Sequence, residues 1–148
     1  MWSGGMDSKP SPSEVNPQWV TPILSPEQWI LVPGAVVKAL ELCGVNDVIT
    51  MHGWTESEFA DCPEFESLQW VDVWVMPADL INVIAQREAL GFTLGRDDWW
   101  IRGCSSAPFE LLCCHESDVH LETVNLQLAD QFRMVFSGCG LDLRQVVN

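Results

Sequence analysis

The clearest structural signal in this chain is the stretch LQWVDVWVMP, residues 68–77. Both of its alternating sets of positions are largely apolar: one set contains Val71, Val73 and Val75, and the other contains Trp70, Trp74 and Met76. Successive side chains of a strand point to opposite faces of a sheet, so this pattern predicts a central strand over residues 68–76, covered on both faces. Pro77 then predicts the start of a helix that ends at Leu90, before Gly91.

The sequence on either side of this stretch predicts further short elements. Ahead of it, residues 33–43 show helical spacing of apolar side chains, Gly44 is a stop signal, and residues 45–52 are expected to form a strand. Behind it, strands are expected at residues 99–103, 109–115 and 118–122. A helix should follow from Val124 or Leu126 to near Ser137, and a last strand is expected within residues 141–147.

These elements predict a single α+β domain over residues 31–148. We expect a two-layer sandwich in which about three helices cover one face of a mixed or antiparallel sheet of about four to six strands. The β-α-β-β-α-β order from residue 68 onward is compatible with a ferredoxin-like arrangement. Residues 1–30 hold five of the nine prolines and are expected to form an extended or partly disordered arm.

The charge of the chain is strongly negative and unevenly distributed. Seven basic and 21 acidic residues give a net charge of −14, and no Lys or Arg lies between Lys38 and Arg87. Within that gap, the segment ESEFADCPEFE (residues 56–66) carries five carboxylates and two phenylalanines. Nucleic-acid binding requires clustered basic residues, so we expect none, whereas a basic protein partner would be attracted. The candidate partner-binding residues are Glu56, Glu58, Phe59, Asp61, Glu64, Phe65 and Glu66.

A second candidate site centres on Asp72. Aromatic rings together with a carboxylate attract cations, so a pocket for a cationic or amphiphilic small molecule is one interpretation. Its residues would be Trp70, Asp72, Trp74, Trp99, Trp100 and Arg102. The structural interpretation is that Asp72 forms an ion pair with Arg87, Arg102 or Arg133, or that it caps a neighbouring backbone group.

The cysteine pattern predicts neither disulfides nor a metal centre. The six cysteines are irregularly spaced, and no secretory signal or apolar stretch of about 20 residues is evident, so we expect reduced thiols in a cytoplasmic protein that is not inserted in a membrane. The run CCHESDVH, residues 113–120, lacks the spacing of a zinc motif. We interpret it as buried cysteines and a surface histidine paired with carboxylates, and we expect no metal or cofactor.

No sequence motif indicates a reaction. Neither a nucleophile elbow nor a glycine-rich phosphate loop is present. The leading hypothesis is therefore a non-catalytic acidic protein of the inhibitor or immunity type, in which carboxylates imitate phosphate charge and Trp or Phe side chains act as anchors. The alternative is a small-molecule binding domain around Asp72, an enzyme of unknown class is the third hypothesis, and a homodimer stays open.

Overall fold

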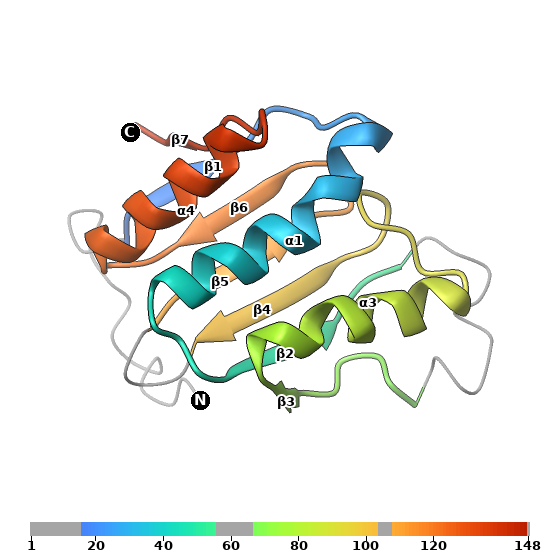
Figure 1. The fold of residues 1–148 in the computed structure, drawn as a ribbon. Helices are drawn as coiled ribbons and strands as arrows, with labels where there is room; N and C mark the ends of the chain where they lie inside the picture. The colour runs from blue at the N-terminus through green and yellow to red at the C-terminus, as the bar shows by residue number, and fades with distance from the viewer. Residues whose placement is uncertain (1–15, 56–66, 104–107, 148) are drawn as a thin grey trace, which may run out of the picture.

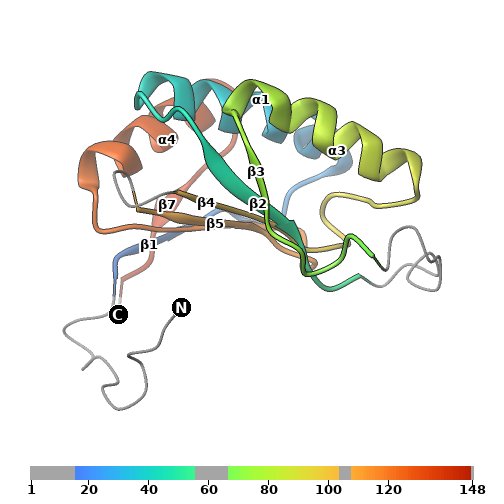
Figure 2. The same cartoon turned by 90° about the horizontal axis from the view of Figure 1, so that it is seen from below.

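The computed structural model describes residues 16–55, 67–103 and 108–147, and there the chain forms a layer of helices on one sheet (Figures 1 and 2). All strand pairs of the sheet are antiparallel, and the strand order is β3-β2-β4-β5-β6-β1-β7. The strands are β1 (Gln18–Val20), β2 (Val48–His52), β3 (Val73–Val75), β4 (Trp99–Gly103), β5 (Glu110–Cys113), β6 (Val119–Glu122) and β7 (Arg144–Gln145). The helices are α1 (Pro26–Leu42), the 3-10 turn η4 (Pro77–Asp79), α3 (Leu80–Ala89) and α4 (Leu126–Gly138).

The expected α+β sandwich is confirmed, although its sheet has seven strands rather than four to six. Two β-α-β units share one design. In the first, β3 and β4 flank β2 and are joined through α3; in the second, β6 and β7 flank β1 and are joined through α4. The ferredoxin-like order from residue 68 onward is not formed, because the middle strand of each unit comes from an earlier part of the chain.

Regular structure begins earlier than the sequence predicts. Within the expected arm, residues 18–20 form β1 and residue 26 begins α1, which was expected only from Pro33. The reason is a capping box: the Ser25 Oγ accepts a hydrogen bond from the Gln28 N–H (3.2 Å), and the Gln28 Oε1 accepts one from the Ser25 N–H (2.9 Å). Pro33 therefore lies inside the helix. Residues 1–15 lie outside the described residues.

The strand predicted over residues 68–76 is only three residues long and is not central. β3 pairs with β2 alone, so it forms one edge of the sheet. Trp70 has a φ of 64°, which turns the backbone before the strand begins. The alternating side chains of residues 68–76 are apolar on both sides for two different reasons. Val75 packs against the core, whereas Trp74 is 62% exposed on the sheet face opposite the described helices.

The remaining elements follow the predicted segments closely. The strand at residues 99–103 has its predicted limits, and α4 begins at Leu126, one of the two expected starts. The helix predicted from Pro77 consists of η4 followed by α3. The other strands are shorter than their apolar patterns at one or both ends.

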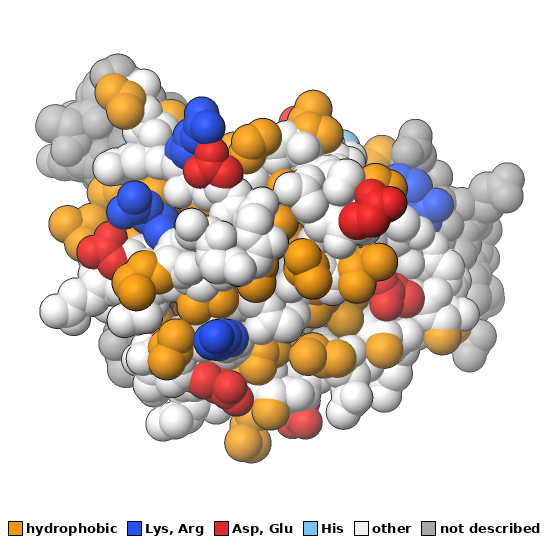
Figure 3. Space-filling model, turned by 45° about the horizontal axis from the view of Figure 1, so that its top comes forward, with side chains coloured by type: hydrophobic (Ala, Val, Ile, Leu, Met, Phe, Trp, Pro, Cys, Tyr) orange, Lys and Arg blue, Asp and Glu red, His pale blue; other side chains and the backbone are white. Residues whose placement is uncertain are grey.

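The hydrophobic core lies between the sheet and the helices. Alternate strand residues point toward the helices, and Trp99, Ile101, Leu111 and Leu121 are among the fully buried ones. The helices contribute buried side chains to the same cluster, including Leu40, Leu80, Phe132 and Phe136. On the outer side of the helices, hydrophobic side chains are spread between charged ones (Figure 3). Within the described residues, all the helices lie on one face of the sheet (Figure 2), and we refer to the opposite face as the helix-free face.

Candidate functional site

The acidic segment singled out in the sequence, residues 56–66, follows β2 along the chain. Its partner-binding candidates, all within residues 56–66, lie outside the described residues. The last described residue before it is Thr55, the third residue after the end of β2, and the first one after it is Ser67. A role for this segment in binding therefore remains a prediction.

The residues of the predicted Asp72 pocket divide between the two faces of the sheet. Trp99 is fully buried beneath the helices, where its Nε1 donates a hydrogen bond to the Thr50 Oγ1 (2.7 Å). Trp100, the next residue of β4, points to the helix-free face. Trp99 therefore does not contribute to a surface that contains Trp100.

Asp72 forms an exposed ion pair. Its Oδ1 lies 2.5 Å from the Arg102 Nη2, and the two side chains are 49% and 35% exposed, respectively. This contact is one of the arginine pairs expected from the sequence. An ion pair at this level of exposure contributes at most about 1 kcal/mol, and it leaves Asp72 engaged rather than available to a ligand.

Two tryptophan rings, those of Trp70 and Trp100, converge on the sheet face opposite the helices, and a third, Trp74, lies on the same face. A Cβ atom at Gly53 would lie 3.0 Å from both the Trp100 Nε1 and the Trp70 Cζ3, so these two rings converge over the Gly53 backbone. Trp74 lies on the same side, opposite Ile49 of β2. Since Trp70 and Trp74 are 58% and 62% exposed, they present a large aromatic area to solvent.

A hollow of about 200 Å³ adjoins this aromatic area on the helix-free face. The pairing of the strands determines which side chains line the hollow. Trp100, Leu112 and His120 form one cross-strand row. Glu110 and Glu122 lie in the neighbouring row. The lining residues are Gln18, Trp100, Glu110, Leu112, His120, Leu121 and Glu122.

The charge of this hollow is negative and incompletely balanced. Glu110 lies directly opposite Glu122, and like charges in this position destabilise a sheet. Burial and the Glu122 carboxylate raise the pKa of Glu110, whereas Arg102 acts in the opposite direction. Arg102 already pairs with Asp72, and Glu122 accepts a hydrogen bond from the Asn16 Nδ2 (3.1 Å). A cation placed between the two glutamates would relieve their repulsion.

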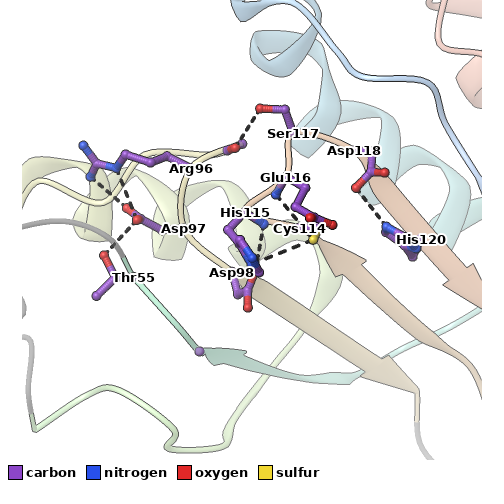
Figure 4. A network of polar contacts seen from close by, with 12 residues as sticks. Thr55, Arg96, Asp97, Asp98, Cys114, His115, Glu116, Ser117, Asp118 and His120 are labelled. Atoms are coloured by element: carbon purple, nitrogen blue, oxygen red, sulfur yellow. Dashed lines mark hydrogen bonds and ion pairs between the residues drawn. The ribbon is translucent and has the colours of Figure 1, made fainter.

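A second polar cluster lies at the end of the sheet where β5 turns into β6 (Figure 4). The turn is closed by backbone hydrogen bonds from Cys114 N to Asp118 O (2.8 Å) and from Ser117 N to Cys114 O (3.0 Å). The Asp98 Oδ1 accepts hydrogen bonds from the His115 backbone N–H (2.8 Å) and lies 2.9 Å from the His115 Nδ1. The turn is thus tied to the residue that precedes β4.

Asp98 is itself held by the end of β2. Its N–H donates to the Trp54 carbonyl (2.8 Å), and its own carbonyl accepts from Gly53 N (3.0 Å). The Trp54 ring packs on the His115 ring, with centroids 4.6 Å apart. The hydrogen bond to Asp98 raises the pKa of His115. Three chain segments therefore fix the position of this imidazole.

The cluster does not have the geometry of a nucleophilic triad. The Cys114 Sγ lies 3.9 Å from the His115 Nδ1, which is the same nitrogen that contacts Asp98. A proton relay needs the nucleophile and the orienting acid at different ring nitrogens. Burial raises the pKa of the Cys114 thiol, and the Asp98 and Asp118 carboxylates raise it further. The hydrogen bond from the Glu116 N–H lowers this pKa but does not cancel the increase. The thiol is therefore a weak nucleophile.

The interpretation of residues 113–120 as buried cysteines and a surface histidine paired with carboxylates agrees with the structure but omits one residue of the cluster. Cys113 is buried in the core, and the His120 Nε2 pairs with the Asp118 Oδ1 at 2.8 Å. The contribution of Asp98 was missed, since it lies 17 residues before His115 and no local pattern connects them. The four cysteines in the described ranges, Cys43, Cys113, Cys114 and Cys139, are free thiols.

Comparisons with known proteins identify no relative. No protein-family model, curated protein or solved structure matches this chain. Within the described ranges, none of the helices combines the length and the apolar content required to span a bilayer. A functional assignment must therefore come from the geometry and charge of the two clusters.

Proposed function

We propose that this chain is a non-catalytic binding protein whose helix-free sheet face engages a basic protein surface. The observation that carries the proposal is the Glu110–Glu122 pair beside Trp100. These two carboxylates face each other across β5 and β6 and, together with the Trp100 ring, line the same hollow. An incoming Lys or Arg side chain would lie between the carboxylates and against the indole.

The energetics of this hollow favour a cationic side chain. A cation over an indole contributes about 0.5–2 kcal/mol, depending on how far it is desolvated. It would also remove the repulsion between Glu110 and Glu122, which the free protein bears. The net charge of −14 adds a long-range field that accelerates association with a basic partner.

The exposed tryptophans would supply the apolar anchors of this interface. Trp70 and Trp74 are more than half exposed, and Trp is enriched among residues that dominate binding energy. Trp70 converges with Trp100, which lines the hollow, and Trp74 lies on the same face of the sheet, so anchors and charge share one face. Carboxylates that imitate phosphate groups would suit the basic cleft of an enzyme that acts on nucleic acids, so we assign the protein to the inhibitor or immunity type.

The size of the hollow favours a partner's side chain over a free small molecule. Its volume is about 200 Å³, below the roughly 300–1,000 Å³ of typical small-molecule pockets. The pocket predicted around Asp72 also loses Trp99 to the core and has Asp72 occupied by Arg102. A protein partner would instead use the hollow together with the exposed tryptophans.

The proposal can be tested with a defined cationic probe. We would titrate the protein with an acetylated, amidated peptide of alternating Gly and Arg residues and follow Trp fluorescence. The double variant Glu110→Gln/Glu122→Gln should bind this peptide several-fold more weakly than the wild type. The control Glu41→Gln/Glu88→Gln removes two exposed charges from helices α1 and α3, so it alters the net charge equally.

The comparison of the two double variants decides the proposal. If the sheet face is the site, the control variant should retain the affinity of the wild type at the same salt concentration. Equal weakening in both double variants would mean that the peptide responds only to overall charge. That result would refute a site at the hollow.

A further inference from the structure

The cluster at the β5–β6 turn brings together three atoms that are common metal ligands. They are the Asp98 Oδ1, the Cys114 Sγ and the His115 Nδ1, and all three lie within 4.8 Å of one another. Figure 4 shows the Asp98, Cys114 and His115 side chains close together at the ends of their strands. This site is separate from the proposed interaction with a basic partner.

The arrangement of the three donor atoms suits a shared cation, because both other atoms lie on the side of the His115 Nδ1. The His115 Nδ1 faces both the Asp98 Oδ1 (2.9 Å) and the Cys114 Sγ (3.9 Å), and a single ring proton can satisfy only one of them well. A metal ion, in contrast, accepts lone pairs from all three. Ligands of a tetrahedral zinc ion lie about 3.3–3.7 Å apart, given bond lengths of about 2.0–2.3 Å. Small side-chain rotations would therefore close the site.

Two of the three donors are held in place before any ion binds. Asp98 and Cys114 are buried, and backbone hydrogen bonds fix both residues: Asp98 to the end of β2 and Cys114 within the turn. The Glu116 N–H donates to the Cys114 Sγ (3.4 Å), which is a typical outer contact of a thiolate ligand. His115 is exposed, so a water molecule can reach the fourth position.

We propose that Asp98, Cys114 and His115 bind one divalent ion of the zinc class, with water as the fourth ligand. Thiolate, imidazole and carboxylate together are a ligand set of zinc and cobalt rather than of magnesium or calcium. Binding replaces the thiol proton of Cys114 with the metal and releases that proton to solvent.

A second group of potential metal ligands, which also includes Cys114, is the main alternative to this site. The Cys114 Sγ also lies within 4.8 Å of the Asp118 Oδ1 and the His120 Nε2. These residues are less buried than Asp98, and they contact each other at 2.8 Å. The Cys114 sulfur therefore lies between the Asp98–His115 pair and the Asp118–His120 pair. Substitution of His115 and His120 in separate variants shows which pair binds the ion.

The test uses Co²⁺ as the probe, because thiolate ligation to cobalt gives a charge-transfer absorption in the near ultraviolet. Reduced, metal-free wild-type protein should bind one Co²⁺ per chain with this absorption, and Zn²⁺ should displace it. Cys114→Ser should abolish the absorption. His115→Gln and Asp98→Asn should weaken Co²⁺ binding at least as much as the ~10–100-fold loss typical of an outer-shell substitution.

Two further variants make the result specific. Cys43→Ser removes another partly buried free thiol and should leave the cobalt spectrum and affinity unchanged. His120→Gln should also retain the site. Near-ultraviolet circular dichroism verifies the fold of each variant; if Asp98→Asn does not fold, the comparison of His115→Gln with His120→Gln carries the test.

Three outcomes would overturn the proposal. The first is the absence of a charge-transfer absorption in the wild type at excess Co²⁺, and the second is its persistence in Cys114→Ser. The third is loss of binding in His120→Gln with retention in His115→Gln, which would transfer the site to Asp118 and His120. None of these outcomes depends on the affinity for a cationic peptide, so failure here and failure of the proposed function are distinguishable.

Discussion

Glu110 and Glu122 lie directly opposite each other on the neighbouring strands β5 and β6, on the face of the sheet opposite helices α1, α3 and α4. Burial and the charge of Glu122 raise the pKa of Glu110, so this pair weakens the free protein. Arg102 lies opposite Glu110 on β4, but its guanidinium forms an ion pair with Asp72. The basic partner proposed above would supply the missing positive charge.

Removal of one charge of the pair should stabilise the free protein. We expect Glu122→Gln to raise the free energy of unfolding by about 0.2–1 kcal/mol at pH 7, because the repulsion of Glu110 is lost. The Gln side chain can still accept the hydrogen bond from Asn16. Urea denaturation at pH 7 measures the change, and a loss of stability would show that the pair is not repulsive.

The pH dependence of stability should contain a contribution from His52. This buried side chain packs edge-on against Phe92, with ring centroids 4.8 Å apart. Burial and the charge of Arg87, opposed by Asp97, lower its pKa from 6.5 to about 3. Between these values the unfolded chain binds a proton that the folded chain does not, so the free energy of unfolding falls as the pH decreases from 6.5 to 3.

The slope of this effect is at most about 1.4 kcal/mol per pH unit. His52→Gln does not titrate, so its stability should depend less on pH over the same window. Urea denaturation of both proteins at several pH values provides the comparison. Parallel curves for the variant and the wild type would contradict the assigned role of His52.

Two glycine substitutions should have opposite effects on stability. Gly53→Ala places a Cβ atom 3.0 Å from the rings of Trp70 and Trp100 and should cost about 1–3 kcal/mol. Gly34 lies inside α1 with no atom within 4 Å of the added Cβ, so Gly34→Ala should gain about 0.5–1 kcal/mol. Thermal melts measure both. A shift of Trp fluorescence in Gly53→Ala alone would confirm that the rings move.

Asp72→Asn should have a small effect. The Asp72–Arg102 pair is substantially exposed, so its loss should cost no more than about 1 kcal/mol. A buried pair would instead cost about 3–5 kcal/mol when one partner is removed. Thermal denaturation distinguishes these two ranges, and a large loss would indicate that Asp72 has a structural role beyond the arginine contact.

Local patterns predict the fold class and several elements, because some segments carry complete signals of their own. The strand at residues 99–103 alternates between the core and the open face, and α4 has apolar residues at helical spacing. The prediction that residues 68–76 form a central strand was wrong, because an apolar pattern does not show whether other strands or helices will cover those side chains. The start of α1 was missed although the capping box at Ser25 and Gln28 is a recognisable local signal.

The candidate sites depend on contacts between distant parts of the chain. Glu110 and Glu122 become neighbours through strand register, and Asp98 meets His115 only when β4 and β5 pair. A single sequence specifies neither register nor pairing partner directly. For the same reason, the sequence could suggest a basic partner but could not show which face of the sheet would bind it.

The position of β1 has a consequence for how the chain acquires its structure. Trp19 pairs with Leu121 of β6 and with Gln145 of β7, so the first strand depends on segments more than 100 residues later. Contacts of such long sequence separation slow folding, because a large loop must close before they form. During synthesis β1 therefore stays without its two partner strands until residues 119–122 and 144–145 have been made. It is made before either partner strand, and its hydrogen bonds to β7 can form only after all the other strands of this sheet have been synthesised.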